Sequence, residues 1–180
     1  MTHSTYFISD THFGHANILT FADDKGNPVR SFSSVEEMDE HMVTQWNSVV
    51  KPGDRVYHLG DVVINKQFLP IMQRLNGRKK LIMGNHDIFG AKKYLEYFED
   101  VQSYRAYAEH GLILSHIPVH ESQLERRFKV NVHGHLHTNL VEKSKHHPDQ
   151  RYLSVCVEKI NYTPVSLEWI LEEVKRRGVA

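Results

Sequence analysis

The chain has 180 residues, which is enough for one sizeable hydrophobic core and short for two, so we expect a single domain spanning residues 1–180. Lys plus Arg and Asp plus Glu number 22 each, so the formal net charge is zero and no overall positive field would attract long duplex nucleic acid. The single cysteine, Cys156, excludes an internal disulfide and a cluster of thiolate ligands.

The sequence predicts neither a membrane span nor a secretory leader. No segment approaches the roughly 18 apolar residues that a spanning helix needs, and the N-terminus lacks a basic region followed by an apolar stretch. Together with the single cysteine, this indicates a cytoplasmic protein. Histidine is the one unusual count, with 14 residues, and this excess needs a functional explanation.

Strands and helices are predicted to alternate through the first half of the chain. The strands are short runs of β-branched and aromatic residues, and the helices carry apolar residues at helical spacing. Ser33 or Ser34, each with a glutamate three residues later, is expected to cap the first helix. The predicted elements are a strand at 5–9, a helix at 35–50, a strand at 55–59, a helix at 66–75, a strand at 79–83 and a short helix at 91–98.

Consecutive strands are predicted in the second half, followed by one helix. The segments 117–129 and 142–150 are expected to be loops. The order of elements predicts an α/β fold of the α+β kind, with mixed sheets. The expected strands are 101–108, 112–115, 130–133 and 152–158, and an amphipathic helix is expected at 167–177.

Side chains that can bind metal ions follow several of the predicted strands. Because strand ends meet at one edge of an open α/β sheet, these side chains can converge on one volume. They offer oxygen and imidazole donors without thiolate, which suits Mn, Fe, Zn, Co or Ni better than calcium or a structural zinc. The donors are too many for one ion, and two ions about 3.5–4 Å apart are typical of phosphoester hydrolysis. The candidates are Asp10, His12, Asp61, Asn85, His86, His116, His135 and His137.

Each candidate alone has a simpler explanation. A lone aspartate at a strand end is more often a turn residue, and a lone strand histidine is more often structural. The hypothesis therefore depends on the order of all the motifs together. Those motifs are DTH at 10–12, GD at 60–61, GNHD at 84–87, SH at 115–116 and GHLH at 134–137.

In this order the motifs resemble those of the calcineurin-like metallophosphoesterases, and in particular the small members from bacteria and phages that lack a cap. The resemblance runs from Ser9 to His137. It implies a four-layer αββα sandwich whose single domain carries a dinuclear metal centre. Mn is the favoured metal, with Fe, Zn, Ni or Co as alternatives.

The resemblance also implies a role for each motif residue. One ion would be held by Asp10, His12 and His137, and the other by Asn85, His116 and His135, with Asp61 bridging the pair. A hydroxide between the ions would attack phosphorus in line with the leaving group. The catalytic residues would be His86, which protonates or stabilises the leaving oxygen, and Asp87, which orients His86 or its loop.

The substrate is expected to be a small or accessible phosphoester. A diester such as a nucleotide, a cyclic nucleotide or a nucleic-acid end is favoured over a monoester, because the chain is neutral and small and has no obvious cap or basic groove. The alternatives are a catalytically silent scaffold that binds protein partners, and a phosphomonoesterase or protein phosphatase. The sequence does not settle the roles of His15, His120, His133 or Arg30. Arg30 is expected to be a solvated charge, which is the commoner case for an arginine, with a contact to the substrate as the alternative. The oligomeric state also stays open.

Overall fold

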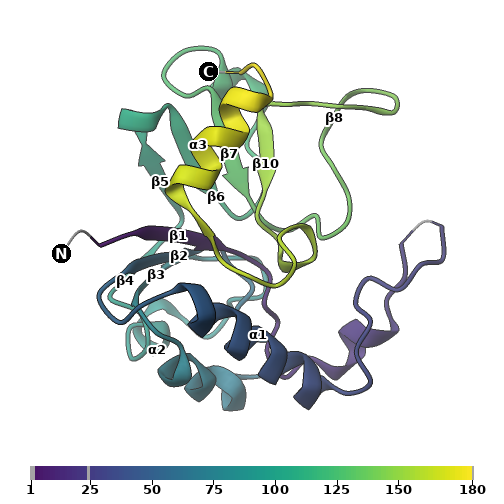
Figure 1. The fold of residues 1–180 in the computed structure, drawn as a ribbon, viewed down its shortest axis with the longest axis vertical. Helices are drawn as coiled ribbons and strands as arrows, with labels where there is room; N and C mark the ends of the chain where they lie inside the picture. Colours follow the sequence, from purple (N-terminus) through teal and green to yellow (C-terminus); the bar gives the residue numbers. More distant parts are fainter. Residues whose placement is uncertain (1–2, 24, 180) are drawn as a thin grey trace.

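Two β-sheets form the centre of the molecule in the computed structural model, which describes residues 3–23 and 25–179 (Figure 1). In the first sheet the strand order is β11-β1-β2-β3-β4, and β1 to β4 run parallel while β11 is antiparallel to β1. Hydrogen bonds pair Phe7 with Tyr57 and align the ends of β1 and β2. The strands are β1 (Thr5–Ile8), β2 (Arg55–His58), β3 (Arg78–Ile82), β4 (Asp100–Gln102) and β11 (Val165–Ser166).

The second sheet has the order β10-β7-β6-β5. Strands β10, β7 and β6 are parallel, and β5 is antiparallel to β6. A separate short hairpin lies in the segment that was expected to be a loop. The strands of the sheet are β5 (Tyr104–Tyr107), β6 (Leu112–Ser115), β7 (Val130–His133) and β10 (Tyr152–Ser154), and the hairpin consists of β8 (Glu142–Ser144) and β9 (His147–Pro148).

Helices flank the sheets. The α-helices are α1 (Val35–Val49), α2 (Ala91–Tyr94) and α3 (Leu167–Arg176). The 3₁₀ helices are η1 (Ala16–Thr20), η2 (Lys66–Arg74), η3 (Ala108–His110), η4 (Glu121–Leu124) and η5 (Val157–Lys159). Ser34 caps α1 by accepting a hydrogen bond from the Glu37 N–H, which is one of the two caps predicted from the sequence.

The two faces of β1 show how the layers stack, because successive side chains of a strand point to opposite sides. On one side, the Tyr6 hydroxyl donates to the Val49 carbonyl of α1. On the other side, the Phe7 ring stacks on Tyr57 at 5.7 Å and meets Tyr107, which belongs to the second sheet. The sheets therefore pack against each other, with α1 outside the first and α3 alongside the second (Figure 1). This arrangement confirms the predicted mixed α/β class.

Several predicted elements differ in detail. The segment 101–108 is not one strand, because β4 ends at Gln102 in the first sheet and β5 begins at Tyr104 in the second. Strand propensity cannot reveal that the chain passes from the first sheet to the second at Ser103. Residues 152–158 are strand only as far as Ser154, and 3₁₀ helix follows. The helix at 66–75 is a 3₁₀ helix containing Pro70, which has no N–H to donate.

Within the described residues, none of the helices combines the length and apolar character that crossing a membrane would require.

Candidate metal centre

The polar residues that follow the strands come together at one edge of the two sheets. Asp10, Asp61 and Asn85 follow the parallel neighbours β1, β2 and β3. His116 follows β6, and the loop after β7 carries His135 and His137. Two groups of potential metal ligands result, and within each group the donor atoms lie within 4.8 Å of one another. The groups are Asp10, His12 and His137, and Asp61, His116 and His135.

In the first group, two imidazoles face one carboxylate oxygen. The Nε2 atoms of His12 and His137 each lie 3.9 Å from Asp10 Oδ1. The other oxygen, Oδ2, is already used, because it accepts from the backbone N–H of His135 at 2.9 Å and from the hydroxyl of Ser9. Both ring nitrogens of His12 are buried without a hydrogen-bond partner in the described part of the chain. An unpartnered lone pair on the Nε2 that faces Asp10 fits a metal ligand, since a buried polar atom without a partner is costly.

In the second group, three atoms that are all acceptors when His116 is neutral lie close together. His116 Nδ1 donates to the Leu59 carbonyl at 2.7 Å, which leaves its Nε2 as a lone pair in the neutral ring. That Nε2 lies 2.9 Å from Asn85 Oδ1 and 3.4 Å from Asp61 Oδ2. Three acceptors at such distances repel one another unless a cation or a proton sits among them. The donor set therefore fits a divalent ion.

One oxygen atom, Asp61 Oδ2, lies close to both ligand groups. Asp61 Oδ2 lies 3.4 Å from His116 Nε2 and 3.6 Å from His12 Nε2. Asp61 Oδ1 points elsewhere and accepts from the His86 N–H at 2.9 Å. The two groups thus share a carboxylate, and they form one continuous site.

The pKa values of the candidate ligands shift in different directions. Burial lowers those of His116 and His137, but the hydrogen bonds and charges of Asp61 and of Glu158, respectively, outweigh it, so both pKa values are raised. Burial would raise the pKa of Asp61, but hydrogen bonding and attraction from His116, together with the His86 N–H, bring it to about 2. Burial raises the pKa of Asp10, an effect that nearby His116 and His137 oppose. Burial, aided by the positive charge of Arg30, lowers the pKa of His12 well below its usual value. A neutral imidazole beside a charged carboxylate is the form in which both bind metals.

The GNHD segment is anchored to the Asp61 loop. The Asp87 carboxylate is 2% exposed and accepts from the backbone N–H groups of Asp61, Val62 and Gly84 at 2.8 to 3.0 Å. These bonds hold the loop that carries His86, whereas none of the hydrogen bonds of Asp87 in the described chain reaches the His86 imidazole.

His86 itself stands at the edge of the site. Its side chain is exposed, and its ring lies 5.7 Å from that of His12. Gly84, the first residue of the GNHD segment, does not have a positive φ. Glycine is required there by close approach, because a Cβ would collide with the Asp61 carboxylate.

The backbone at the ligands is unusual. Among the described residues, eight non-glycine positions have a positive φ. Five of them are candidate ligands: Asp10, His12, Asp61, His135 and His137. Residues other than glycine seldom adopt this region, and such conformations cluster at functional sites. The residues with unusual backbone conformations are therefore largely the same residues whose side chains form the two ligand groups.

Two important residues have no detectable signal in the sequence. Arg30, expected as a solvated charge or a substrate ligand, is only 2% exposed and donates to the backbone carbonyls of Asp10 and Thr11. Its Nε also donates to Glu158 Oε1 at 2.7 Å, and the same oxygen accepts from His137 Nδ1 at 3.0 Å. Glu158 follows no motif, and it lies 128 positions from Arg30.

The unassigned histidines take different positions. His15 lies beside the site, with its ring 5.7 Å from that of His12 and its Nδ1 buried without a partner in the described chain. His133 is buried, donates to the Gly134 carbonyl and has its pKa lowered by burial to about 4. His120 is exposed at the start of η4, where it accepts from the Ser122 N–H. Of these three, only His15 has a ring contact with a candidate ligand among the described residues.

Known proteins resemble this chain along most of its length, although no family model matches it. The uncharacterized protein MJ1445 of Methanocaldococcus jannaschii is 36% identical over 179 residues, which cover 97% of this chain and 93% of MJ1445. The crystal structure of AQ665 from Aquifex aeolicus, a protein of unknown function, matches with a TM-score of 0.71 and 28% identity over 95% of this chain and 99% of that one. A structure described as a novel archaeal phosphodiesterase matches with a TM-score of 0.45 and 19% identity over 85% of this chain and 82% of that one, which is too weak to assign a function.

Proposed function

This chain belongs to the same family as the uncharacterized protein MJ1445, and we propose that it is a dinuclear metal-dependent phosphoesterase of the calcineurin-like type. The observation that carries the proposal is the position of Asp61 Oδ2, 3.6 Å from His12 Nε2 and 3.4 Å from His116 Nε2. A carboxylate shared by two ligand groups is what a pair of ions requires for its bridge.

The ligands are proposed to divide as the motif resemblance implies. Asp10, His12 and His137 would hold one ion, Asn85, His116 and His135 the other, and Asp61 both. The unpartnered nitrogens of His12 and the facing acceptors around His116 Nε2 support this division. Mn²⁺ is the first candidate, because oxygen and imidazole donors without thiolate suit it, with Fe, Zn, Ni or Co as alternatives.

When bound, two divalent ions supply a water of lowered pKa and polarise the phosphoryl oxygens. The protein's own contribution is to hold the phosphate and assist departure of the leaving group. His86 is suited to this task, because its imidazole is exposed at the edge of the site while its backbone N–H is held by Asp61. We propose that His86 donates a proton to the departing oxygen or stabilises the charge that develops there.

A phosphodiester is favoured over a monoester as the substrate, and a nucleotide or a nucleic-acid end would fit the neutral composition. A silent scaffold is the competing proposal, which the complete ligand set and the exposed His86 oppose. A phosphomonoesterase or protein phosphatase is the third. Residues 1–180 would act as one domain, and the buried, unpaired Cys156 favours a cytoplasmic location.

The test is hydrolysis of bis-p-nitrophenyl phosphate and p-nitrophenyl phosphate with each divalent metal. His86→Ala should lower kcat by roughly 10²–10⁴-fold with metal binding retained, as expected for loss of a general acid. Asp61→Asn should lose both rate and metal. His120→Ala is the matched control, because His120 is an exposed histidine outside the site, and it should keep the wild-type rate.

Two results would count against the proposal. If the wild-type protein turned over neither ester with any metal and purified with little bound metal, the scaffold would be the better description. If His86→Ala and His120→Ala were equally active, the role given to His86 would be wrong.

A further inference from the structure

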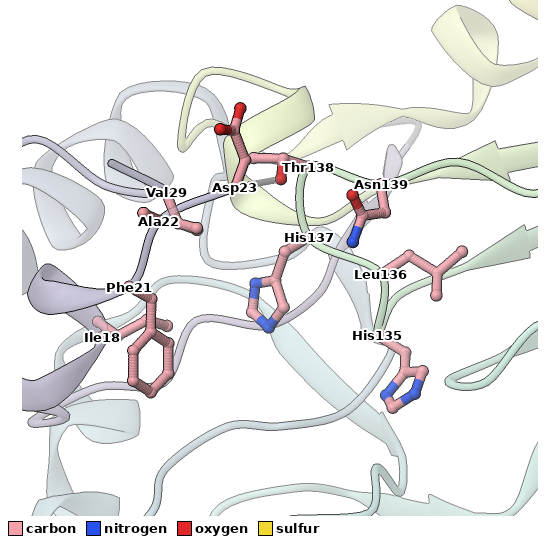
Figure 2. A pocket seen from close by; sticks show the side chains of 10 residues that line it. All are labelled: Ile18, Phe21, Ala22, Asp23, Val29, His135, Leu136, His137, Thr138 and Asn139. Carbon is pink, nitrogen blue, oxygen red and sulfur yellow. The ribbon is translucent and has the colours of Figure 1, made fainter. Parts of the chain in front are cut away.

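A cavity of about 300 Å³ lies directly beside two of the candidate ligands, His135 and His137 (Figure 2). One wall is apolar and comes from Ile18, Phe21 and Val29. In Figure 2 the His137 ring lies between Phe21 and the Asn139 side chain, and the cavity is thus lined by candidate ligands of the site itself. A substrate whose phosphate lies at His137 would extend into this space.

The apolar wall presents an aromatic ring. Phe21 is 49% exposed, although a large apolar side chain usually gains by burial. It is nevertheless well placed, because its ring meets that of His15 edge to face at 5.8 Å, and the His15 ring lies 5.7 Å from that of His12. The backbone is held as well, since the Val29 N–H donates to the Phe21 carbonyl at 2.8 Å. An exposed aromatic ring fixed near a metal ligand is suited to stacking on a planar group.

The charges around the cavity favour an uncharged ligand group over an anionic one. Among the described residues that line it there is no lysine or arginine, and Asp23 supplies a carboxylate. Hydrogen bonds from Asn27 lower the pKa of Asp23, so this carboxylate is charged and would repel a second phosphate. The Asn139 side-chain amide has no hydrogen-bond partner within the described residues, and it can pair with polar edges of a ligand.

We propose that this cavity binds the base of a nucleoside whose phosphate ester is held at the metal centre, which makes a nucleoside phosphodiester the substrate class. This rests on the proposed phosphoesterase function. The base would stack on Phe21, and Asn139 would contact its polar edge. A second cavity at the site is lined by Met83, Asn85, His116 and Ile117, and the described residues that line it include no phenylalanine, tyrosine or tryptophan to offer an equivalent stack.

The test compares two esters that share one leaving group. Thymidine 5′-(p-nitrophenyl phosphate) and methyl p-nitrophenyl phosphate both release p-nitrophenol, so their kcat/KM ratio isolates the contribution of the nucleoside. The wild-type ratio should be about 5 or more, because stacking of a base on an aromatic side chain is worth about 5- to 160-fold. Phe21→Ala should reduce the ratio by about fivefold or more, and Phe21→Tyr should keep it. Trp169→Ala, which removes an exposed aromatic ring from α3, should leave it unchanged.

Binding of thymidine monophosphate and methyl phosphate to the Mn²⁺-loaded protein, measured by calorimetry, gives a second readout independent of turnover. Tighter binding of the nucleotide, lost in Phe21→Ala, supports the proposal even if neither ester is hydrolysed, in which case only the proposed function fails. Equal kcat/KM for the two esters, or an unchanged ratio in a folded Phe21→Ala, overturns the base site while leaving the phosphoesterase function intact.

Discussion

Glu158→Gln removes one negative charge from a carboxylate buried between Arg30 and His137. Glu158 Oε1 lies 2.7 Å from Arg30 Nε and 3.0 Å from His137 Nδ1, and its side chain is 3% exposed. Burial would raise the pKa of Glu158, but the contacts with His137 and Arg30 lower it, so the native side chain is charged. The variant keeps the size of the side chain and loses the charge that both partners contact.

Two losses are expected from this substitution. The hydrogen bond to Glu158 keeps the proton of His137 on Nδ1 and its Nε2 lone pair on the side of Asp10. Partners that orient a ligand in this way are worth about 10- to 100-fold in metal affinity, or about 1.4 to 2.8 kcal/mol. In addition, the buried guanidinium of Arg30 loses its counter-charge, which should lower the free energy of unfolding of the metal-free protein by about 3 kcal/mol or more.

Calorimetric titration with Mn²⁺ and unfolding of the metal-free protein by denaturant measure the two losses separately. Glu173→Gln is the matched control, because Glu173 accepts from Arg176 and Arg177 on α3, apart from the site. It should lose at most about 1 kcal/mol of stability and keep the wild-type affinity. If Glu158→Gln were less stable but bound Mn²⁺ as tightly as Glu173→Gln, the reasoning that Glu158 holds His137 for the metal would be refuted.

Removing the metals with EDTA should lower the free energy of unfolding by about 2.7 kcal/mol for each bound ion if free Mn²⁺ had been 100 times its Kd, and equal melting temperatures with and without EDTA would contradict this. Gly134→Ala should abolish binding at the Asp10 group, because a Cβ there collides with Ser9 and the Asp10 carboxylate; the Mn²⁺ stoichiometry measures the loss. Burial raises the pKa of Asp39 to about 6, so its stabilising contribution is complete below its unfolded value of 3.8 and is lost as the pH rises through about 6. Asp39→Asn, which can still accept from the Gly14 N–H, should therefore melt higher than the wild type at pH 8 and similarly at pH 4.

The residue types at the candidate site and their order along the chain can be predicted, because both are visible in short local motifs. Each motif directly follows a short apolar run, and a strand that ends at a known residue fixes where the next side chains project. Strands β6 and β7 begin and end at the predicted residues, and they deliver His116 and the His135 loop to the expected edge. Parallel pairing of β1 with β2 and of β2 with β3 then brings Asp10 and Asp61 together.

The buried residues that contact the candidate ligands cannot be predicted in the same way, because their contacts join segments that are distant in the sequence. Arg30 and Glu158 meet only after the loop before α1 has folded against the segment after β10. The change of sheet at Ser103 depends on which strand is available as a partner, and propensity carries no information about that. The cavity beside His137 likewise combines residues near η1 with the loop after β7.

The positive φ angles show how the proposed metal site can be ordered in the metal-free protein. A left-handed conformation costs a side-chain-bearing residue about 1–2 kcal/mol, so it persists only where other contacts determine it. Those contacts are backbone hydrogen bonds: the Asp10 N–H donates to the Gly60 carbonyl, the His12 N–H to the Asp61 carbonyl, and the His135 N–H to the Asp10 carboxylate. The sheets hold the ligands in an unfavourable backbone conformation through bonds that do not involve the metal. The donors are therefore ordered by folding itself, and binding need not bear that conformational cost.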